Sequence, residues 1–528
     1  MKKTVAILLA FSLIFCFASC TKEKTENPDT ETTASAENVS NNNAGDGNNS
    51  VELLSVYSKH EYSSREGEGS GFILSEVNYE TLYLSDEDEQ RYPNLAKAIG
   101  SMNKEETVRY EECADELAVM CDERFEFTAD TDDEPIPYTA YLDYFICRAD
   151  NVVLSLRVDS DEYVGTVYPN YCAEGYNYDT ATGKKLAVTD IMNDISSLSS
   201  ILSEKIMNNE KYKDEVYGNP EEVISEYAVE DYLWTVGYDG VTFYLNPFEV
   251  APYSAGVITA TVYFDEYPEL FNKKYTVAPE AYATGLPDGR NVEFDMNPAD
   301  GKRDTINVGL SDYEDELYEY ITVALNGSEF TVEDIFALSA EFYLVNSKGK
   351  YYVYLVTHSF NDYTDILVYD LNGGKIKECG IVGRTDFGKI VGDDYYSKYI
   401  FNNPSEFVLE TTFDVLSTYS AAKTYTVNSE TGMPESTDEF YAVDKSFPHV
   451  LVSKEGFGVE ILPDMKTELV KAGSKFTLLR TDGETYVDAK LGDGRECRIN
   501  VERDEECYQL LIGGKSEYDI FENVYYAG

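Results

Sequence analysis

Short runs in which apolar and polar side chains alternate recur along most of this chain of 528 residues. Their apolar members are mainly Tyr, Val, Phe and Ile, and the chain contains 45 tyrosines and 25 phenylalanines. Alternation with a period of two places successive side chains on opposite faces of a strand, and aromatic and β-branched residues favour that conformation. Clear examples are residues 152–156, 241–245, 257–264, 351–358, 365–370 and 476–479. The sequence therefore predicts a body in which β-sheets dominate.

Helical patterns are fewer than strand patterns, and capping signals mark where they begin. Asn219 precedes Pro220 and two glutamates, an order that is typical of a helix N-terminus. Thr189 stands before apolar residues at helical spacing. We also expect a short helix from Pro93 and another after Thr331. The predicted fold class is α+β.

An apolar stretch at residues 5–17 follows two lysines at the N-terminus. This stretch is too short to span the hydrocarbon core of a bilayer, which is about 30 Å thick, and it has the order of a secretory signal peptide. No later stretch is apolar over about 18 residues, so we expect no transmembrane helix. The pattern indicates an exported protein.

Cys20 follows this stretch, with Ala18 and Ser19 immediately before it. Small residues before a cysteine resemble the lipobox of bacterial lipoproteins. The resemblance implies a signal peptide at residues 1–19, acylation of Cys20, and attachment to the outer face of the cytoplasmic membrane by lipid alone. The alternative is an ordinary signal peptide cleaved near Ala18. Residues 20–50 contain no aromatic residue and are predicted to be a disordered tether.

The formal net charge is −56, from 98 acidic and 42 basic residues. Proteins that bind nucleic acid need a basic surface, so this composition excludes a nucleic-acid partner. Two interpretations of the acidity remain open. It serves solubility alone, or it recruits a cationic partner.

Nine cysteines are present, of which one lies in the predicted signal peptide and Cys20 in the lipobox. Seven remain, and an odd number leaves at least one unpaired within a monomer. We predict candidate disulfides between Cys147 and Cys172, which flank strands, and between Cys497 and Cys507, which lie across a hairpin. No CxxC pair exists, so we predict no zinc or other metal site, and no cofactor.

Residues 177–190 predict a strand, a tight turn and a capped helix, and residues 240–256 contain a strand followed by Asn-Pro-Phe-Glu-Val-Ala-Pro-Tyr-Ser-Ala-Gly. This order resembles the domain of unknown function in the ectodomains of RsiV-like anti-sigma factors, which also accompanies certain peptidoglycan deacetylases. The resemblance covers about residues 51–275, and residues 51–135 look like the smaller module that precedes that domain. Where family members have Gly-Gly-Ala-His, this chain has residues 168–172.

Pro247 and Pro252 cannot lie inside a central strand, so the motif predicts a bend between two strands. Asn246 and Glu249 are placed to hydrogen-bond the bent backbone, and Gly256 permits a turn. A structural role is one interpretation of these residues. The other is that the bend forms the rim of a site for a protein or glycan ligand.

A chain of this length holds about three or four domains. The turn spacing after residue 461 resembles a bacterial SH3-like barrel, which implies contact with peptidoglycan. The expected order is a signal peptide at 1–19, a tether at 20–50, a small α+β module at 51–135, an RsiV-like α+β domain at 136–278, a β-rich domain at 279–460 and a small barrel at 461–528.

No nucleophile, metal or nucleotide motif is present, and the three histidines lie far apart, so we assign no catalytic residue. The main prediction is a non-enzymatic protein of the bacterial cell surface that binds or senses peptidoglycan, another glycan or a cationic protein. The alternative is an envelope hydrolase, or an accessory to a deacetylase, that uses carboxylates as acid and base. A cleft holding an acid with a raised pKa would favour the alternative.

Overall fold

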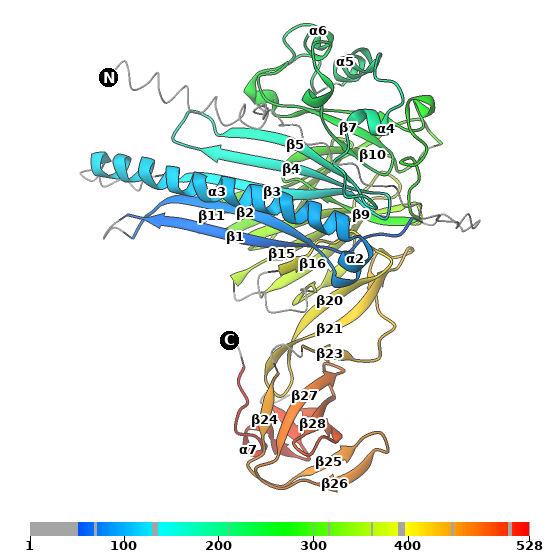
Figure 1. Ribbon diagram of the computed structural model, residues 1–528. Coiled ribbons are helices and arrows are strands. Elements are labelled where there is room, and N and C mark those ends of the chain that lie inside the picture. The colour runs from blue at the N-terminus through cyan, green and yellow to red at the C-terminus, as the bar shows by residue number, and fades with distance from the viewer. Residues whose placement is uncertain are drawn as a thin grey trace, which may run out of the picture.

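The computed structural model describes ten segments of the chain, and sheets dominate them, as the alternation predicted (Figure 1). The predicted signal peptide, Cys20 and the tether lie outside these segments. The segments are residues 51–67, 71–128, 136–209, 211–297, 299–314, 317–360, 363–388, 397–444, 448–504 and 509–526.

A six-stranded sheet forms the middle of the molecule (Figure 1). Its strands β2 and β3 are parallel, and every other neighbouring pair is antiparallel. In spatial order they are β19 (Ser397–Tyr399), β1 (Val56–Glu66), β2 (Ile73–Leu84), β3 (Tyr138–Ala149), β4 (Val153–Tyr163) and β5 (Asn170–Asp179). The domain boundary expected at residue 135 therefore falls between two hydrogen-bonded strands of one sheet.

The helix α3 (Pro93–Thr128) lies along one face of this sheet and joins the parallel strands β2 and β3 (Figure 1). It begins at Pro93 as predicted, and Leu95, Ile99 and Met102 are buried beneath it. It is much longer than expected because parallel strands need a long crossover connection. A shorter helix, α2 (Asp86–Arg91), precedes it.

A second unit packs a three-stranded sheet against short helices, at the top of Figure 1. Asn219 caps α6 as predicted, since its side chain accepts a hydrogen bond from the backbone of Glu221 at 3.2 Å. The start expected at Thr189 is wrong, because the helix begins at Val188 and Thr189 lies inside it. The helix is also split in two, because the Asp194 carboxylate binds the backbone nitrogen of Ser196 and competes with helical bonds. The elements are α4 (Val188–Ile191), α5 (Leu198–Asn208), α6 (Pro220–Ile224), β6 (Leu233–Val236), β7 (Gly240–Leu245) and β8 (Ile258–Tyr263), with 3₁₀ turns η1 (Val229–Asp231), η2 (Tyr253–Ala255) and η3 (Pro268–Leu270).

Two further sheets are formed by strands between residues 281 and 382. One has the order β17 (Lys377–Val382), β16 (Thr364–Asp370), β15 (Lys350–His358), β14 (Ser339–Ser347) and β9 (Ala281–Leu286). The other has the order β10 (Arg290–Phe294), β11 (Asp304–Glu314), β12 (Leu317–Leu325) and β13 (Ser328–Val332). The helix expected after Thr331 is wrong. Asp334 and Phe336 adopt left-handed backbone angles there, with φ of 60° and 44°, and these are incompatible with a right-handed helix.

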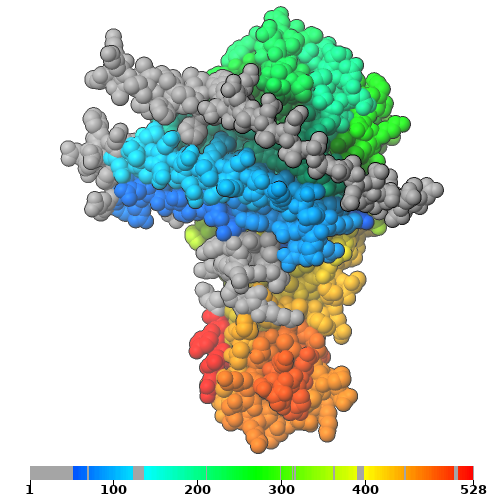
Figure 2. All heavy atoms as spheres, in the orientation of Figure 1, coloured from blue at the N-terminus to red at the C-terminus, as the bar shows by residue number. Residues whose placement is uncertain are grey.

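The C-terminal part projects away from the other sheets (Figures 1 and 2). Its main sheet has the order β18 (Thr385–Phe387), β20 (Phe407–Asp414), β21 (Thr418–Val427), β23 (Tyr441–Val443), β27 (Lys475–Thr481), β28 (Tyr486–Leu491), β29 (Glu496–Asn500), β25 (Gly458–Ile461) and β26 (Lys466–Leu469). The strands β22 (Pro434–Glu435) and β24 (Val450–Val452) branch from it. A small sheet of β30 (Glu502–Arg503), β31 (Leu510–Ile512) and β32 (Lys515–Ser516) and the helix α7 (Glu517–Ile520) complete this part.

Two properties of the described segments concern the remaining predictions. The main C-terminal sheet continues across the boundary expected at residue 461, and no sheet in these segments closes into a barrel. None of the helices in the same segments is long and apolar enough to cross a membrane.

Arg148 fixes the three-stranded unit to the six-stranded sheet. It lies at the end of β3 with no solvent exposure, and its Nε donates to Asp150 at 2.7 Å. Its terminal nitrogens donate to the backbone carbonyls of Gly237, Tyr275 and Val277. This contact sets the angle between the two units, and the candidate site lies where they meet.

Candidate ligand-binding site

The two faces of the six-stranded sheet differ in character. On β3, Leu142, Tyr144 and Ile146 are buried in the core that includes α3. The alternate residues point to the other face, where Asp143 is exposed. His60 on β1 also lies there, opposite Glu80 of β2, with Nε2 3.1 Å from the Glu80 carboxylate. On β3, one face therefore packs against the core that includes α3, and the other presents Asp143.

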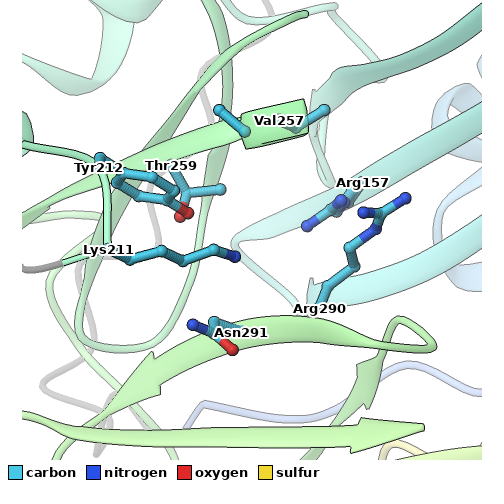
Figure 3. Close-up of a pocket in the computed structure, with 8 residues that line it drawn as sticks. Arg157, Lys211, Tyr212, Val257, Thr259, Arg290 and Asn291 are labelled. Atoms are coloured by element: carbon cyan, nitrogen blue, oxygen red, sulfur yellow. The ribbon is translucent and has the colours of Figure 1, made fainter. Parts of the chain in front are cut away.

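A small pocket opens where this polar face meets the three-stranded and four-stranded sheets (Figure 3). It is an open hollow with an internal volume of about 20 Å³. Junctions of this kind are common positions for ligand sites. The pocket is lined by Arg157 of β4, Thr259 of β8, Arg290 and Asn291 of β10, Lys211 and Tyr212 after α5, and Ala255 and Val257 before β8.

Three of the lining side chains are cationic. Arg157 is paired with Asp159, to which its Nε and Nη2 donate at 2.6 and 2.9 Å. The Arg290 guanidinium lies over the ring of Tyr171, 4.4 Å from its centroid. The Lys211 side chain extends across the hollow towards both arginines (Figure 3). Lys211 remains accessible to solvent, but partial desolvation and the nearby Arg290 lower the pKa of its ammonium group.

Three aromatic rings form a row beside the pocket, which we call the aromatic ladder: Tyr168, Tyr253 and Phe248. Tyr168 stacks on Tyr253 with ring centroids 4.8 Å apart, and Phe248 lies 5.9 Å from Tyr253 on its other contact. Tyr168 and Phe248 are 58% and 65% exposed. The turn η2 begins at Tyr253 and ends at Ala255, which lines the pocket, so ladder and pocket are continuous.

The bend between β7 and β8 holds the ladder in place. Asn246 accepts a hydrogen bond from the backbone of Ala173 on β5 at 2.8 Å, and Glu249 accepts one from the backbone of Asn246 at 3.1 Å. The Tyr227 hydroxyl donates to Glu249 at 2.5 Å. The predicted bond of Glu249 to the backbone of the bend is therefore confirmed, whereas the Asn246 side chain binds the backbone of β5 instead.

Phe248 adopts a strained backbone conformation on this bend. Its φ is 73°, in the left-handed region, which is a clear outlier for a bulky residue. Its ring is nonetheless mostly exposed and so gains little from burial. Strain that is held in place by surrounding contacts is a common property of binding sites.

A pair of carboxylates lies on the same polar face. Asp143 on β3 is directly opposite Asp159 on β4. Like charges at such positions destabilise a sheet. Although Asp143 is accessible, the surrounding strands desolvate it, and this effect together with the nearby Glu80 raises the pKa of Asp143 to about 7. No pattern in the sequence indicated this pair, because among 98 acidic residues no two stand out.

Two of the three histidines also lie beside carboxylates. His60 Nε2 is 3.1 Å from Glu80 Oε1, and His358 Nε2 is 3.3 Å from Glu341 Oε1. Lys398 of β19 donates to the same oxygen of Glu341 at 2.5 Å. These contacts join segments far apart in sequence, so no local motif could predict them.

The predicted disulfide between Cys147 and Cys172 is incompatible with the sheet. Cys147 is on β3 and Cys172 on β5, and β4 lies between these strands. Cys172 is opposite Ser160, and Ser160 is opposite Leu142, five positions from Cys147. Strands lie about 4.8 Å apart, so two strand spacings already exceed the roughly 7 Å limit for the Cα atoms of a disulfide.

The second predicted disulfide stays a prediction. Cys497 is buried on β29, and burial raises the pKa of its thiol to about 12. Cys507 lies outside the described residues. Over the segments that the structure describes, no group of three or more His, Cys, Asp or Glu side chains is arranged to hold a metal ion.

Comparisons with known proteins concern the part of the chain that holds the bend. A family model described as "Protein of unknown function (DUF3298)" matches residues 186–265, within the region 136–278 where the sequence predicted a domain of unknown function. A search of curated proteins found no match.

Two solved structures are similar to part of the chain. One is a member of the DUF3298 family from Bacteroides fragilis NCTC 9343, with 16% identity, a TM-score of 0.31, and coverage of 43% of this chain and 96% of that chain. The other is a DUF3298 family protein from Pseudomonas aeruginosa PAO1, with 13% identity, a TM-score of 0.27, and coverage of 43% and 98%. On the family match, residues 186–265 of this chain are a DUF3298 domain.

Proposed function

We propose that this chain is a lipid-anchored, non-enzymatic protein of the bacterial cell surface that binds a glycan of the envelope, such as peptidoglycan, on its aromatic ladder. The observation that supports this is the 65% exposure of Phe248 on a bend held by hydrogen bonds, together with the 58% exposure of Tyr168 between β4 and β5. Flat aromatic faces suit the apolar faces of sugar rings. A site already held in its bound shape loses little entropy when the ligand binds.

The N-terminus supports the proposed location. An acyl group on Cys20 would hold the chain at the membrane, and the tether at residues 20–50 would separate the body from the lipid. The net charge of −56 disfavours contact of that body with anionic lipid. Contact of an SH3-like C-terminal part with the wall, as the turn spacing after residue 461 implies, would add a second attachment to the same ligand.

Retention on purified peptidoglycan sacculi tests the proposal. We expect the mature chain to sediment with sacculi, and Phe248→Ala and Tyr253→Ala to reduce the retained fraction at least fivefold. Tyr313→Ala is the matched control, because Tyr313 is 62% exposed and contacts Tyr318. Both of these tyrosines belong to the four-stranded sheet and not to the ladder. Equal retention of all variants would contradict the ladder. Binding of lysozyme in place of sacculi would make the ligand a cationic protein.

Attachment is tested separately. Cys20→Ser should move the protein from the membrane fraction to the soluble fraction and should abolish its labelling by a fatty-acid analogue. A variant that stays in the membrane fraction would contradict the lipid anchor while leaving the glycan site untouched.

The carboxylate pair favours an envelope hydrolase as a second candidate. Asp143, with a pKa raised to about 7, has the protonation of a general acid, and Asp159 is held by Arg157 and by the Tyr171 hydroxyl. Two acids in different environments are the usual arrangement for glycoside cleavage. Release of reducing ends from peptidoglycan between pH 5 and 8, lost in Asp143→Asn, would support this candidate. No release at any pH would exclude it.

A further inference from the structure

We propose that the pocket lined by Arg157, Lys211 and Arg290 is a binding site for a carboxylate group of the ligand. The inference rests on the proposed function, since a glycan on the aromatic ladder would place a carboxylate beside it. It adds a chemical class to the ligand, because neutral glycans have no group for this pocket.

Three cations line this pocket, although acidic residues of the chain outnumber basic ones 98 to 42. Several arginines elsewhere are paired with carboxylates. Arg303, for example, contacts three carboxylates. Across the described segments, neither Lys211 nor Arg290 has a carboxylate oxygen within 4.0 Å of its side-chain nitrogens. Two cations that share one hollow with no carboxylate in contact repel each other, and an anion between them reduces that repulsion.

The cations are held in place before any ligand binds. Arg290 lies flat on the Tyr171 ring, and Arg157 is fixed by Asp159. Lys211 points into the space in front of both guanidinium groups (Figure 3). A guanidinium group can bind both oxygens of a carboxylate through parallel hydrogen bonds, and an ammonium group adds a third donor. Desolvation, and after it the charge of Arg290, lower the pKa of Lys211.

The balance of charge favours a carboxylate over a phosphate. Arg157 is neutralised by Asp159, which leaves Lys211 and Arg290. Asp161 lies near Arg290. Burial raises the pKa of the Asp161 carboxyl, and the positive charge of Arg290 opposes that rise. Asp288 also lies near Arg290, which opposes the rise in its pKa. Two carboxylates therefore offset part of the positive charge, and the remainder suits a carboxylate better than a phosphate with nearly two charges.

The pocket and the aromatic ladder can engage one ligand. A Cβ placed on Gly256 would lie 3.5 Å from Arg290 Nη1, so the bend that holds the ladder is in contact with the cationic group. Ala255 lines the pocket two positions after Tyr253. A sugar stacked on the ladder therefore has its substituents within reach of the pocket. Sugars that bear a carboxylate on the ring or on a lactyl group belong to the class that this geometry fits.

Titration with N-acetylmuramic acid and with its methyl ester tests the proposal on the mature chain. We expect the acid to bind at least tenfold more tightly than the ester. Lys211→Gln and Arg290→Gln should reduce this preference to less than twofold. Lys475→Gln is the matched control, because it removes the same charge from an exposed position on β27. Circular dichroism confirms that each variant is folded, and Lys211, which is exposed, is the less disruptive of the two sites.

The outcomes separate this inference from the proposed function. Equal binding of acid and ester, with oligomers of N-acetylglucosamine still bound through Phe248, would overturn the carboxylate site and leave the glycan function standing. A preference for the acid that depends on Arg290, without any retention on sacculi, would support the carboxylate site and contradict the glycan function. Displacement of the acid by an equal concentration of inorganic phosphate would overturn the assignment to carboxylates.

Discussion

Arg148 and Asp150 form an ion pair from which water is excluded, with both side chains at 0% exposure and Nε 2.7 Å from Oδ2. The Arg148 guanidinium also binds three backbone carbonyls of a neighbouring unit. Each polar group in this cluster depends on the others for its hydrogen bonds. The pair therefore links two units of the chain and not merely two residues of one strand.

Loss of this pair should be costly. Arg148→Met leaves the Asp150 carboxylate buried without its partner, which typically costs about 3–5 kcal/mol. Calorimetry should show a large fall in the melting temperature of the unit at residues 186–275. Arg495→Met is the control, because that arginine and its partner Glu468 are 48% and 40% exposed and such pairs contribute at most about 1 kcal/mol. Similar effects of the two substitutions would contradict the importance of burial here.

Phe248 allows backbone strain to be separated from binding. Its left-handed conformation costs roughly 1–2 kcal/mol for a residue with a Cβ atom, and glycine avoids that cost. Phe248→Gly should therefore be more stable than Phe248→Ala by about 1 kcal/mol. Both variants should lose sugar binding equally, because both lack the ring. Stability is measured by thermal denaturation, and a glycine variant less stable than the alanine variant would contradict the strain.

Acidification should stabilise the folded protein between pH 8 and pH 5.5. Desolvation raises the pKa of Asp143 to about 7 and that of Asp239 to about 6, whereas both groups in the unfolded chain titrate near 4. Between pH 4 and 7 the folded state thus binds more protons than the unfolded state, so stability falls as the pH rises. Burial lowers the pKa of His449 and acts in the opposite direction, but it is a single group.

Melting temperatures across this pH range check the prediction. We expect a higher value at pH 5.5 than at pH 8, and a smaller difference in Asp143→Asn, which cannot ionise. Lys475→Gln should leave the pH dependence unchanged. A melting temperature that rises steadily from pH 5.5 to pH 8 would be the opposite of what these pKa values require.

The cysteines give a prediction about covalent structure. Because β4 separates Cys147 from Cys172, peptide mapping without reduction should recover no crosslink between them. Cys147→Ser should leave the melting temperature within about 2 °C of the unmodified protein. The same map decides whether Cys497 and Cys507 are joined. A crosslinked peptide containing Cys147 and Cys172 would mean that the strand order is different.

Local signals in the sequence identified the parts of the fold that depend on neighbouring residues. The start of α3 at Pro93, the cap at Asn219 and the bend around Pro247 each follow from backbone constraints within a few positions. The sequence did not predict that the helix near Thr189 is split in two. The bond of the Asp194 carboxylate that competes with the helical bonds is also local, but it is a weaker signal in the sequence.

Contacts between distant segments were beyond such signals. The pocket combines Arg157, Lys211 and Arg290 from three parts of the fold, and no spacing in the sequence relates them. Part of the aromatic ladder could be predicted from the sequence, because Phe248 and Tyr253 lie in the motif that suggested a rim. Tyr168 is brought to them only by the fold. The register of the strands decides which side chains come together, and a shift of one residue would turn each side chain to the opposite face.

The pairing of β1 with β19 has a consequence for folding during synthesis. Tyr57 of β1 pairs with Tyr399, which the ribosome adds 342 positions later. Throughout that interval β1 is an unprotected edge on which another nascent chain could add a strand. The outer strand contains Lys59, His60 and Glu61, and charged groups at an edge discourage such additions. These charged residues therefore discourage pairing of β1 with another copy of the chain until β19 has been synthesised.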